Sequence, residues 1–116
     1  MHELSLAQGV LDIVQQYVQP DNQHEVRTVR MKVGELSGVV VESLTFCFAA
    51  IISGTAMEGA RLEIERIHLR CKCRVCQKET LIQDNKFSCA ACGSVDIDII
   101  AGRELQVLDI ELDDGG

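Results

Sequence analysis

With 116 residues, of which 47% are hydrophobic, the chain is long enough to bury the core of one compact domain. Its longest apolar run, around residues 46–52, is far shorter than the roughly 20 residues of a membrane-spanning helix, which excludes a transmembrane protein. The 18 acidic and 11 basic side chains leave a formal net charge of −7, which repels nucleic acid unless the basic groups gather on one face.

The amino-terminal segment predicts an amphipathic helix over residues 4–18. Its apolar residues recur at helical spacing, and Pro20 stops the pattern. No Ser, Thr, Asp or Asn precedes Glu3, so the charge of Glu3 near the helix dipole is the only visible support at that end. The segment lacks the basic stretch and apolar core of a secretion signal, and we therefore expect the protein in the cytoplasm.

The next segments predict a strand and a second helix. Residues 29–33 alternate apolar and basic side chains, as in a half-buried strand that runs into a turn at residues 34–38. A helix follows and is placed to end at Gly54. Its apolar face comprises Leu44, Cys47, Phe48, Ile51 and Ile52. On that face, Cys47 is most simply a buried core thiol.

Two further strands complete the expected fold. Residues 62–69 alternate apolar and charged side chains with one change of parity, which suggests a strand with a bulge or a strong twist. Residues 105–112 predict the last strand. We therefore predict an α+β fold, in which a small three-stranded sheet and two helices are formed by residues 1–70 and completed by residues 103–113. An inserted zinc-ribbon-like domain, different in composition, occupies residues 71–99 and holds five of the six cysteines.

The strongest chemical signal is a pair of Cys-x2-Cys motifs, Cys73 with Cys76 and Cys89 with Cys92. Each motif makes a tight turn, and four sulfurs from two facing turns reach tetrahedral positions about 2.3 Å from one zinc ion. Zinc would then supply folding free energy to a segment with few apolar residues. Four basic residues near the motifs would offset the double negative charge of the site: Lys72, Arg74, Lys78 and Lys86.

The cysteines allow other interpretations besides zinc binding. Without an export signal the six thiols should stay reduced, which favours metal or thiol chemistry over disulfides. A redox Cys-x2-Cys pair normally stands alone at the start of a helix, and iron–sulfur chemistry is a further alternative. Cys71 is an additional cysteine beside the first motif. It is either an alternative metal ligand or a reactive thiol that does not bind the metal. The usual two-residue spacing favours Cys73 as the partner of Cys76, so Cys71 is left out of the ligand set.

The amino terminus offers a second candidate metal site. His2 combines an imidazole with the α-amine of Met1 and a backbone amide in one short chelate, a nitrogen-rich set that nickel(II) and copper(II) favour. A bulky second residue should hinder removal of Met1, which keeps the chelate geometry fixed. From composition alone, the simpler alternative is a solvated histidine without a role. His24, in a polar connection, and His68, on the outer face of a strand, receive that simpler interpretation.

Several short motifs occur in order along the whole chain. They are Met1-His2-Glu3-Leu4, Val33-Gly34-Glu35-Leu36, Glu42-Ser43-Leu44 with Phe46 and Phe48, Gly54-Thr55, Glu58-Gly59-Ala60, the two cysteine pairs, Cys92-Gly93-Ser94 and Gly102-Arg103-Glu104-Leu105. In this combination the chain resembles the HypA/HybF family of hydrogenase-maturation nickel metallochaperones. It departs from the family at Ala90, where a proline is frequent, and in the extra thiol of Cys71, but neither change removes a ligand.

The resemblance implies a non-enzymatic nickel carrier with a nickel-binding α/β domain and a separate zinc domain. Nickel would be held by His2 with neighbouring main-chain nitrogens, those of Met1 and Glu3, and structural zinc by the four paired cysteines. The implied partners are a HypB-type GTPase that supplies nickel, the large-subunit precursor of nickel-iron hydrogenase that receives it and, in some organisms, the urease pathway. The sequence has no glycine-rich phosphate-binding motif, so nucleotide hydrolysis is expected to belong to a partner.

The sequence leaves three further possibilities open. A zinc-ribbon nucleic-acid-binding or adaptor protein also uses paired cysteines, but the chain has no Trp, one Tyr and three Phe, and so lacks aromatic side chains for base stacking. A thiol–disulfide sensor would release zinc when its cysteine pairs oxidise. A homodimer is plausible because a three-stranded sheet leaves exposed edges.

Overall fold

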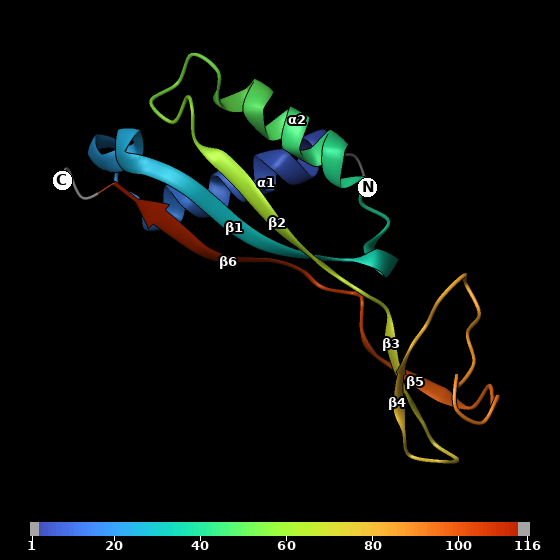
Figure 1. The fold of residues 1–116 in the computed structure, drawn as a ribbon. Helices are drawn as coiled ribbons and strands as arrows, with labels where there is room; N and C mark the ends of the chain where they lie inside the picture. The colour runs from blue at the N-terminus through green and yellow to red at the C-terminus, as the bar shows by residue number, and fades with distance from the viewer. Residues whose placement is uncertain (1–2, 114–116) are drawn as a thin grey trace. The chain divides into compact units, whose positions relative to one another are not determined.

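The computed structural model describes residues 3–113, and its helices and strands are labelled in Figure 1. In chain order they are α1 (Glu3–Tyr17), the short 3-10 helix η1 (Pro20–Glu25), β1 (Val26–Gly34), the 3-10 helix η2 (Glu35–Ser37), α2 (Val41–Ile52), β2 (Arg61–Ile67), β3 (Arg70–Cys73), β4 (Glu79–Leu81), β5 (Ile97–Ala101) and β6 (Leu105–Leu112). The described chain divides into two compact units. The first comprises residues 3–32, 38–65 and 106–113, and the second comprises residues 33–37 and 66–105.

The first unit contains both α-helices, which pack against each other. Their buried faces consist of Ala7, Val10, Leu11 and Val14 in α1 and of Leu44, Phe48 and Ile52 in α2. These residues recur at helical spacing, so each helix presents one apolar stripe to the core. Both predicted helices are thus confirmed. Within residues 3–113, neither helix has the length and hydropathy that a membrane span requires.

The prediction for Cys47 was wrong in its degree of burial. The side chains of Leu44, Phe48 and Ile52 lie on one face of α2 and point into the core. Each of them is at most 2% exposed. Cys47 lies one position before Phe48 and is therefore rotated toward the border of the apolar stripe. Its thiol is only half-buried.

The sheet beside the helices has the strand order β2-β1-β6, so β1 is its central strand. The ion pairs of Arg30, which lies in β1, reflect this strand order. Its guanidinium lies 3.0 Å from a carboxylate oxygen of Asp109 and 3.0 Å from one of Glu111, both in β6, and 3.5 Å from Glu63 in β2. One central arginine thus contacts acidic residues from both neighbouring strands, and the predicted three-stranded sheet with two helices is confirmed.

The expected single strand over residues 62–69 was wrong. β2 ends at Ile67, and a separate strand, β3, begins at Arg70 in the other sheet. The parity changes between Ile64 and Ile67, where the first unit ends at Glu65, and Ile67 is followed in the second unit by Leu69. Its side chain is 6% exposed and lies in an apolar cluster of the second unit. The change of parity that suggested a bulge therefore marks the place where the chain passes from one sheet to the other.

The second unit is organised by β3, which pairs antiparallel with β4 on one side and with β5 on the other. Because alternate residues of a strand share a face, Cys71 and Cys73 face inward and are buried, while Arg70 and Lys72 are exposed. The inner face carries a small apolar core of Leu69, Cys71, Ile82, Ile97 and Ile99. The segment has few apolar residues, as its sequence indicated, but several of them pack into one cluster.

Two glycines allow three chain segments to meet inside the second unit. A Cβ added to Gly34 would lie 2.1 Å from the carbonyl oxygen of Gly102, and one added to Gly102, whose φ is +116°, would lie 2.9 Å from Cα of Leu69. The close approach permits two short backbone hydrogen bonds, from Gly34 N–H to the Glu104 carbonyl and from Leu36 N–H to the Gly102 carbonyl, each 2.7 Å. The Val-Gly-Glu-Leu and Gly-Arg-Glu-Leu motifs therefore meet where only glycine fits.

Candidate metal centre

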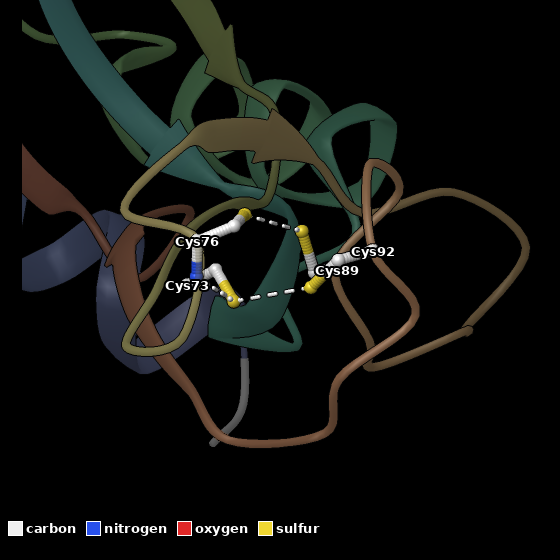
Figure 2. Close-up of side chains that lie close together, drawn as sticks. All are labelled: Cys73, Cys76, Cys89 and Cys92. Atoms are coloured by element: carbon white, nitrogen blue, oxygen red, sulfur yellow. Dashed lines mark hydrogen bonds between the residues drawn. The ribbon is translucent and has the colours of Figure 1, made fainter.

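Figure 2 shows the four paired cysteines with their sulfurs turned toward one another. The Sγ atoms of Cys73, Cys76, Cys89 and Cys92 all lie within 4.8 Å of each other. Two contacts of 3.6 Å, from Cys73 to Cys92 and from Cys76 to Cys89, each join one cysteine from each motif. Elsewhere in residues 3–113, no three His, Cys, Asp or Glu side chains are grouped to hold a metal. The fold thus assembles one metal-binding site from both motifs.

Each motif forms a turn closed by backbone hydrogen bonds, and we call these turns the first knuckle (residues 73–78) and the second knuckle (residues 89–94). In the first, Gln77 N–H donates to the Cys73 carbonyl at 3.0 Å, with Gln77 at a φ of 67°. In the second, Gly93 N–H donates to the Cys89 carbonyl at 2.8 Å, with Gly93 at a φ of 79°. In each knuckle, a residue with left-handed backbone conformation follows the second cysteine and ends the turn.

Backbone N–H groups in the knuckles favour thiolates at the first cysteine of each motif. The N–H groups of Cys76 and Val75 point at Cys73 Sγ over 3.4 and 3.3 Å and lower the pKa of that thiol. In the second knuckle, the N–H groups of Cys92 and Ala91 lower the pKa of Cys89 to about 6. Because a metal binds the thiolate form, these donors prepare two of the four sulfurs as ligands.

Cys92 shows the opposite tendency. The N–H of Ser94 favours its thiolate, but the neighbouring sulfurs of Cys73, Cys89 and Cys76, together with burial, outweigh that donor and raise its pKa to about 12. Four thiolates this close repel one another, so without a cation the cluster retains protons on some of its sulfurs. A bound divalent cation would remove this obstacle and displace the protons.

Cys71, the spare thiol of the sequence, does not join the cluster. Its side chain is 0% exposed in the apolar core of the second unit, and its Sγ lies 3.4 Å from Thr80 Oγ1. The same Thr80 hydroxyl accepts the N–H of Ala90 in the second knuckle at 3.4 Å. Although Cys71 shares a strand face with Cys73, its sulfur serves in packing beneath the site.

The expectation that four basic side chains offset the charge of the thiolates was wrong for Arg74. Its guanidinium is engaged by carboxylates instead, with Nε 3.0 Å from Asp98, Nη2 on the second oxygen of the same carboxylate, and Nη1 3.2 Å from Asp96. One positive and two negative charges leave this group with a formal charge of −1. The backbone N–H donors of the knuckles, rather than Arg74, therefore stabilise the thiolates.

Glu3, His24 and His68 do not belong to the group of metal-ligating side chains in the described chain. Met1 and His2 fall outside the described residues, and Glu3, which begins α1, accepts a hydrogen bond from Val40 N–H at 3.4 Å. His24 is exposed in η1. His68 is exposed too, but its Nδ1 lies 2.9 Å from Glu35 Oε1, a carboxylate that also accepts the Leu69 N–H at 2.9 Å. This hydrogen-bonded pair was not predicted from the sequence.

The fold and the site define a class of protein: a small α+β protein in two units, one of which carries a four-cysteine metal-binding site. The model of the family described as hydrogenase/urease nickel incorporation, metallochaperone, HypA matches residues 1–112. The chain belongs to this HypA family. The resemblance found in the sequence motifs is thereby confirmed.

Individual relatives give the same result. A hydrogenase maturation factor HypA from Streptomyces avermitilis is 42% identical over 99% of this chain and 89% of its own length. Proteins of the same name from Geotalea uraniireducens and a Nostoc strain are each 37% identical, over 97% and 98% of this chain and 100% and 97% of their own lengths. The similarity therefore extends through both units.

Two solved structures share the fold at low sequence identity. The solution structure of the nickel metallochaperone HypA from Helicobacter pylori covers 97% of this chain with a TM-score of 0.62, and a second solution structure of a HypA protein covers 97% with a TM-score of 0.67. The present chain covers 98% and 96% of those chains, and both are 20% identical to it. At 20% sequence identity, the similarity to these two structures shows a shared fold and nothing further.

Proposed function

We propose that this protein is a nickel metallochaperone for the maturation of nickel-iron hydrogenase, with a structural zinc ion in the four-cysteine site. The observation that carries the proposal is membership of the nickel-incorporation family over residues 1–112, together with the four converging sulfurs. In this proposal nickel is the cargo and is bound at the amino terminus by His2 with the main-chain nitrogens of Met1 and Glu3. An amino-terminal chelate can release its ion by ligand exchange on contact with a partner.

The donor set supports zinc as the resident ion. Four soft thiolates with tetrahedral placement suit zinc or an iron–sulfur centre, whereas nickel(II) and copper(II) favour square-planar or tetragonal nitrogen and oxygen sets. Sulfurs about 2.3 Å from a central zinc ion form a tetrahedron with edges of about 3.8 Å. Two of the observed sulfur separations are 3.6 Å and all four sulfurs lie within 4.8 Å of one another, so a change of about 1 Å or less in each separation would fit the cluster to zinc. When bound, zinc would join the two knuckles and stabilise the second unit.

The remaining parts of the proposal concern partners and location. We infer a HypB-type GTPase as the nickel donor, the hydrogenase large-subunit precursor as the acceptor, and the urease pathway as a second client in organisms that possess one. The protein itself is proposed not to be an enzyme, so GTP turnover by the isolated chain above background would contradict this assignment. The cytoplasm is the proposed location because four thiols must stay reduced to bind zinc.

The decisive experiment is a nickel(II) titration of the untagged, zinc-loaded protein, followed by calorimetry and visible absorption. His2→Ala is compared with His24→Ala, a control because His24 is an exposed histidine outside the proposed chelate. We expect about one nickel per chain for the wild type and for His24→Ala, and loss of that site in His2→Ala. Equal nickel binding by all three proteins, or by none, would remove the nickel site from the amino terminus.

A separate measurement tests zinc. Zinc content by elemental analysis, and the thiolate-to-metal charge-transfer bands of the cobalt(II)-substituted protein, are compared for Cys73→Ser and Cys71→Ser. We expect Cys73→Ser to lose the four-thiolate spectrum, while Cys71→Ser keeps both the spectrum and one zinc per chain. The reverse pattern would mean that Cys71 is the ligand and Cys73 is not.

A further inference from the structure

We propose that Arg74, Asp96 and Asp98 form an ion-pair clamp that holds the two knuckles together and slows the release of the metal ion. This inference rests on the proposed zinc site and assigns a positioning role to three residues that are not ligands. Arg74 lies inside the first knuckle, directly after Cys73, whereas Asp96 and Asp98 lie between the second knuckle and the end of β5. The group, called the Arg74 clamp below, thus connects the two halves of the site.

The Arg74 clamp has the geometry of a strong surface interaction. Asp98 receives two guanidinium nitrogens of Arg74, Nε and Nη2, one on each carboxylate oxygen, while Asp96 receives Nη1 at 3.2 Å. Bidentate arginine–carboxylate pairs are stronger and more directional than single contacts. Each of these side chains is about half exposed, with exposed fractions of 59% for Arg74, 57% for Asp96 and 49% for Asp98, so water weakens the attraction but not the geometric constraint.

The backbone reinforces the same connection. Arg74 N–H donates to the Asp96 carbonyl at 3.0 Å, so this pair of residues is joined by main chain and side chain together. Asp96 N–H in turn donates to Ser94 Oγ at 3.1 Å, and the Ser94 carbonyl accepts the N–H of Cys89 at 2.8 Å. A continuous path of hydrogen bonds therefore leads from the first knuckle to Cys89 without passing through the sulfurs.

The Arg74 clamp affects how a metal ion can leave the site. Release requires at least one knuckle to swing away, because the four sulfurs otherwise surround the ion together. The Arg74 clamp ties the first knuckle to the segment that supports the second, so one knuckle cannot open alone without breaking this clamp. Local opening of this kind is governed by the contacts that it must break. Preorganisation of the site should accordingly slow metal exchange while leaving the ligand set unchanged.

The clamp is tested by the rate at which zinc passes from the protein to a chromophoric chelator under reducing conditions. The variants are Arg74→Gln, which removes the guanidinium, and Asp98→Asn, which keeps the side-chain shape but removes its charge. Arg61→Gln is the matched control, since Arg61 forms an exposed ion pair with Glu63 at 3.0 Å in the first unit. Cobalt(II) spectra of each variant report whether the four-thiolate set is intact.

We expect Arg74→Gln and Asp98→Asn to release zinc about three- to tenfold faster than the wild type, as loss of a bidentate surface pair allows. Arg61→Gln should release it at the wild-type rate, and all variants should give the wild-type cobalt spectrum. Arg74→Lys keeps the positive charge but removes the bidentate geometry, because lysine cannot contact both carboxylate oxygens in the same way. Faster zinc release from Arg74→Lys than from the wild type would support the bidentate contact. A wild-type rate in Arg74→Lys would overturn that part of the inference.

These measurements distinguish failure of the Arg74 clamp from failure of the zinc site. If wild-type protein holds zinc but Arg74→Gln and Asp98→Asn release it at the wild-type rate, the Arg74 clamp has no role in metal retention and the zinc site stands. If wild-type protein gives no thiolate–cobalt spectrum and holds no zinc, the zinc assignment fails and the clamp falls with it.

Discussion

Replacement of Gly34 by alanine tests the close chain crossing in the second unit. The added Cβ would lie 2.1 Å from the oxygen and 2.2 Å from the carbon of the Gly102 carbonyl, and 2.7 Å from Arg103 N. Ordinary contacts begin near 3.4 Å, so the two segments must separate by about 1 Å. Because the three nearest atoms all belong to the backbone, no side-chain rotation can relieve these contacts.

The expected cost follows from two effects. Overpacking costs about 1–3 kcal/mol, and the two 2.7 Å hydrogen bonds beside the crossing contribute about 0.5–1.5 kcal/mol each, which gives a loss of about 2–6 kcal/mol. For a chain of this length, about 4 °C of melting temperature corresponds to 1 kcal/mol, so Gly34→Ala should melt about 8–24 °C below the wild type. Thermal unfolding of the zinc-loaded protein, followed by circular dichroism, measures the difference.

Gly9 provides a matched control, because the same substitution should have the opposite sign there. It lies inside α1, and nothing lies within 4 Å of an added Cβ. Alanine favours the helix over glycine by up to about 1 kcal/mol, so Gly9→Ala should melt at or a few degrees above the wild type. If Gly34→Ala unfolds within 2 °C of the wild type, about half a kcal/mol, the steric argument for the crossing is refuted.

Three further predictions concern the second unit. Removal of zinc by a chelator should speed amide hydrogen exchange in β3 and β5 while α1 and α2 keep their protection; uniform loss of protection would mean that the metal is needed by both units. Cys71→Ala should keep one zinc per chain but lower the melting temperature, since it leaves a space in the apolar core, and an unchanged melting temperature would argue against tight packing there. Glu35 should stabilise the protein in a pH-dependent way: the Leu69 N–H and His68 lower its pKa below the ordinary 4.5, so its contribution is complete above that value and is lost as the pH falls through the lowered pKa. The difference in urea stability between wild type and Glu35→Gln should therefore shrink with acidification below pH 4.5, and a constant difference from pH 7 to pH 3 would contradict the pairing.

The features that could be predicted from the sequence are those whose physical cause lies within a few consecutive residues. The stripes of α1 and α2 recur every three or four positions, and the two Cys-x2-Cys motifs each contain their own turn. A pattern of that kind needs no knowledge of a distant partner. The four-cysteine cluster could be predicted because it required only that two such turns face each other. The family was also readable from the order of short motifs.

The remaining features depend on strand register, which places together residues that are far apart in the chain. Arg74 stands 24 positions from Asp98, and only the pairing of β3 with β5 shows that its charge is used by carboxylates and not by thiolates. The burial of Cys71 and the contact of Gly34 with Gly102 have the same origin. Composition cannot reveal such contacts, because the free energy of a contact depends on geometry that long-range backbone pairing creates.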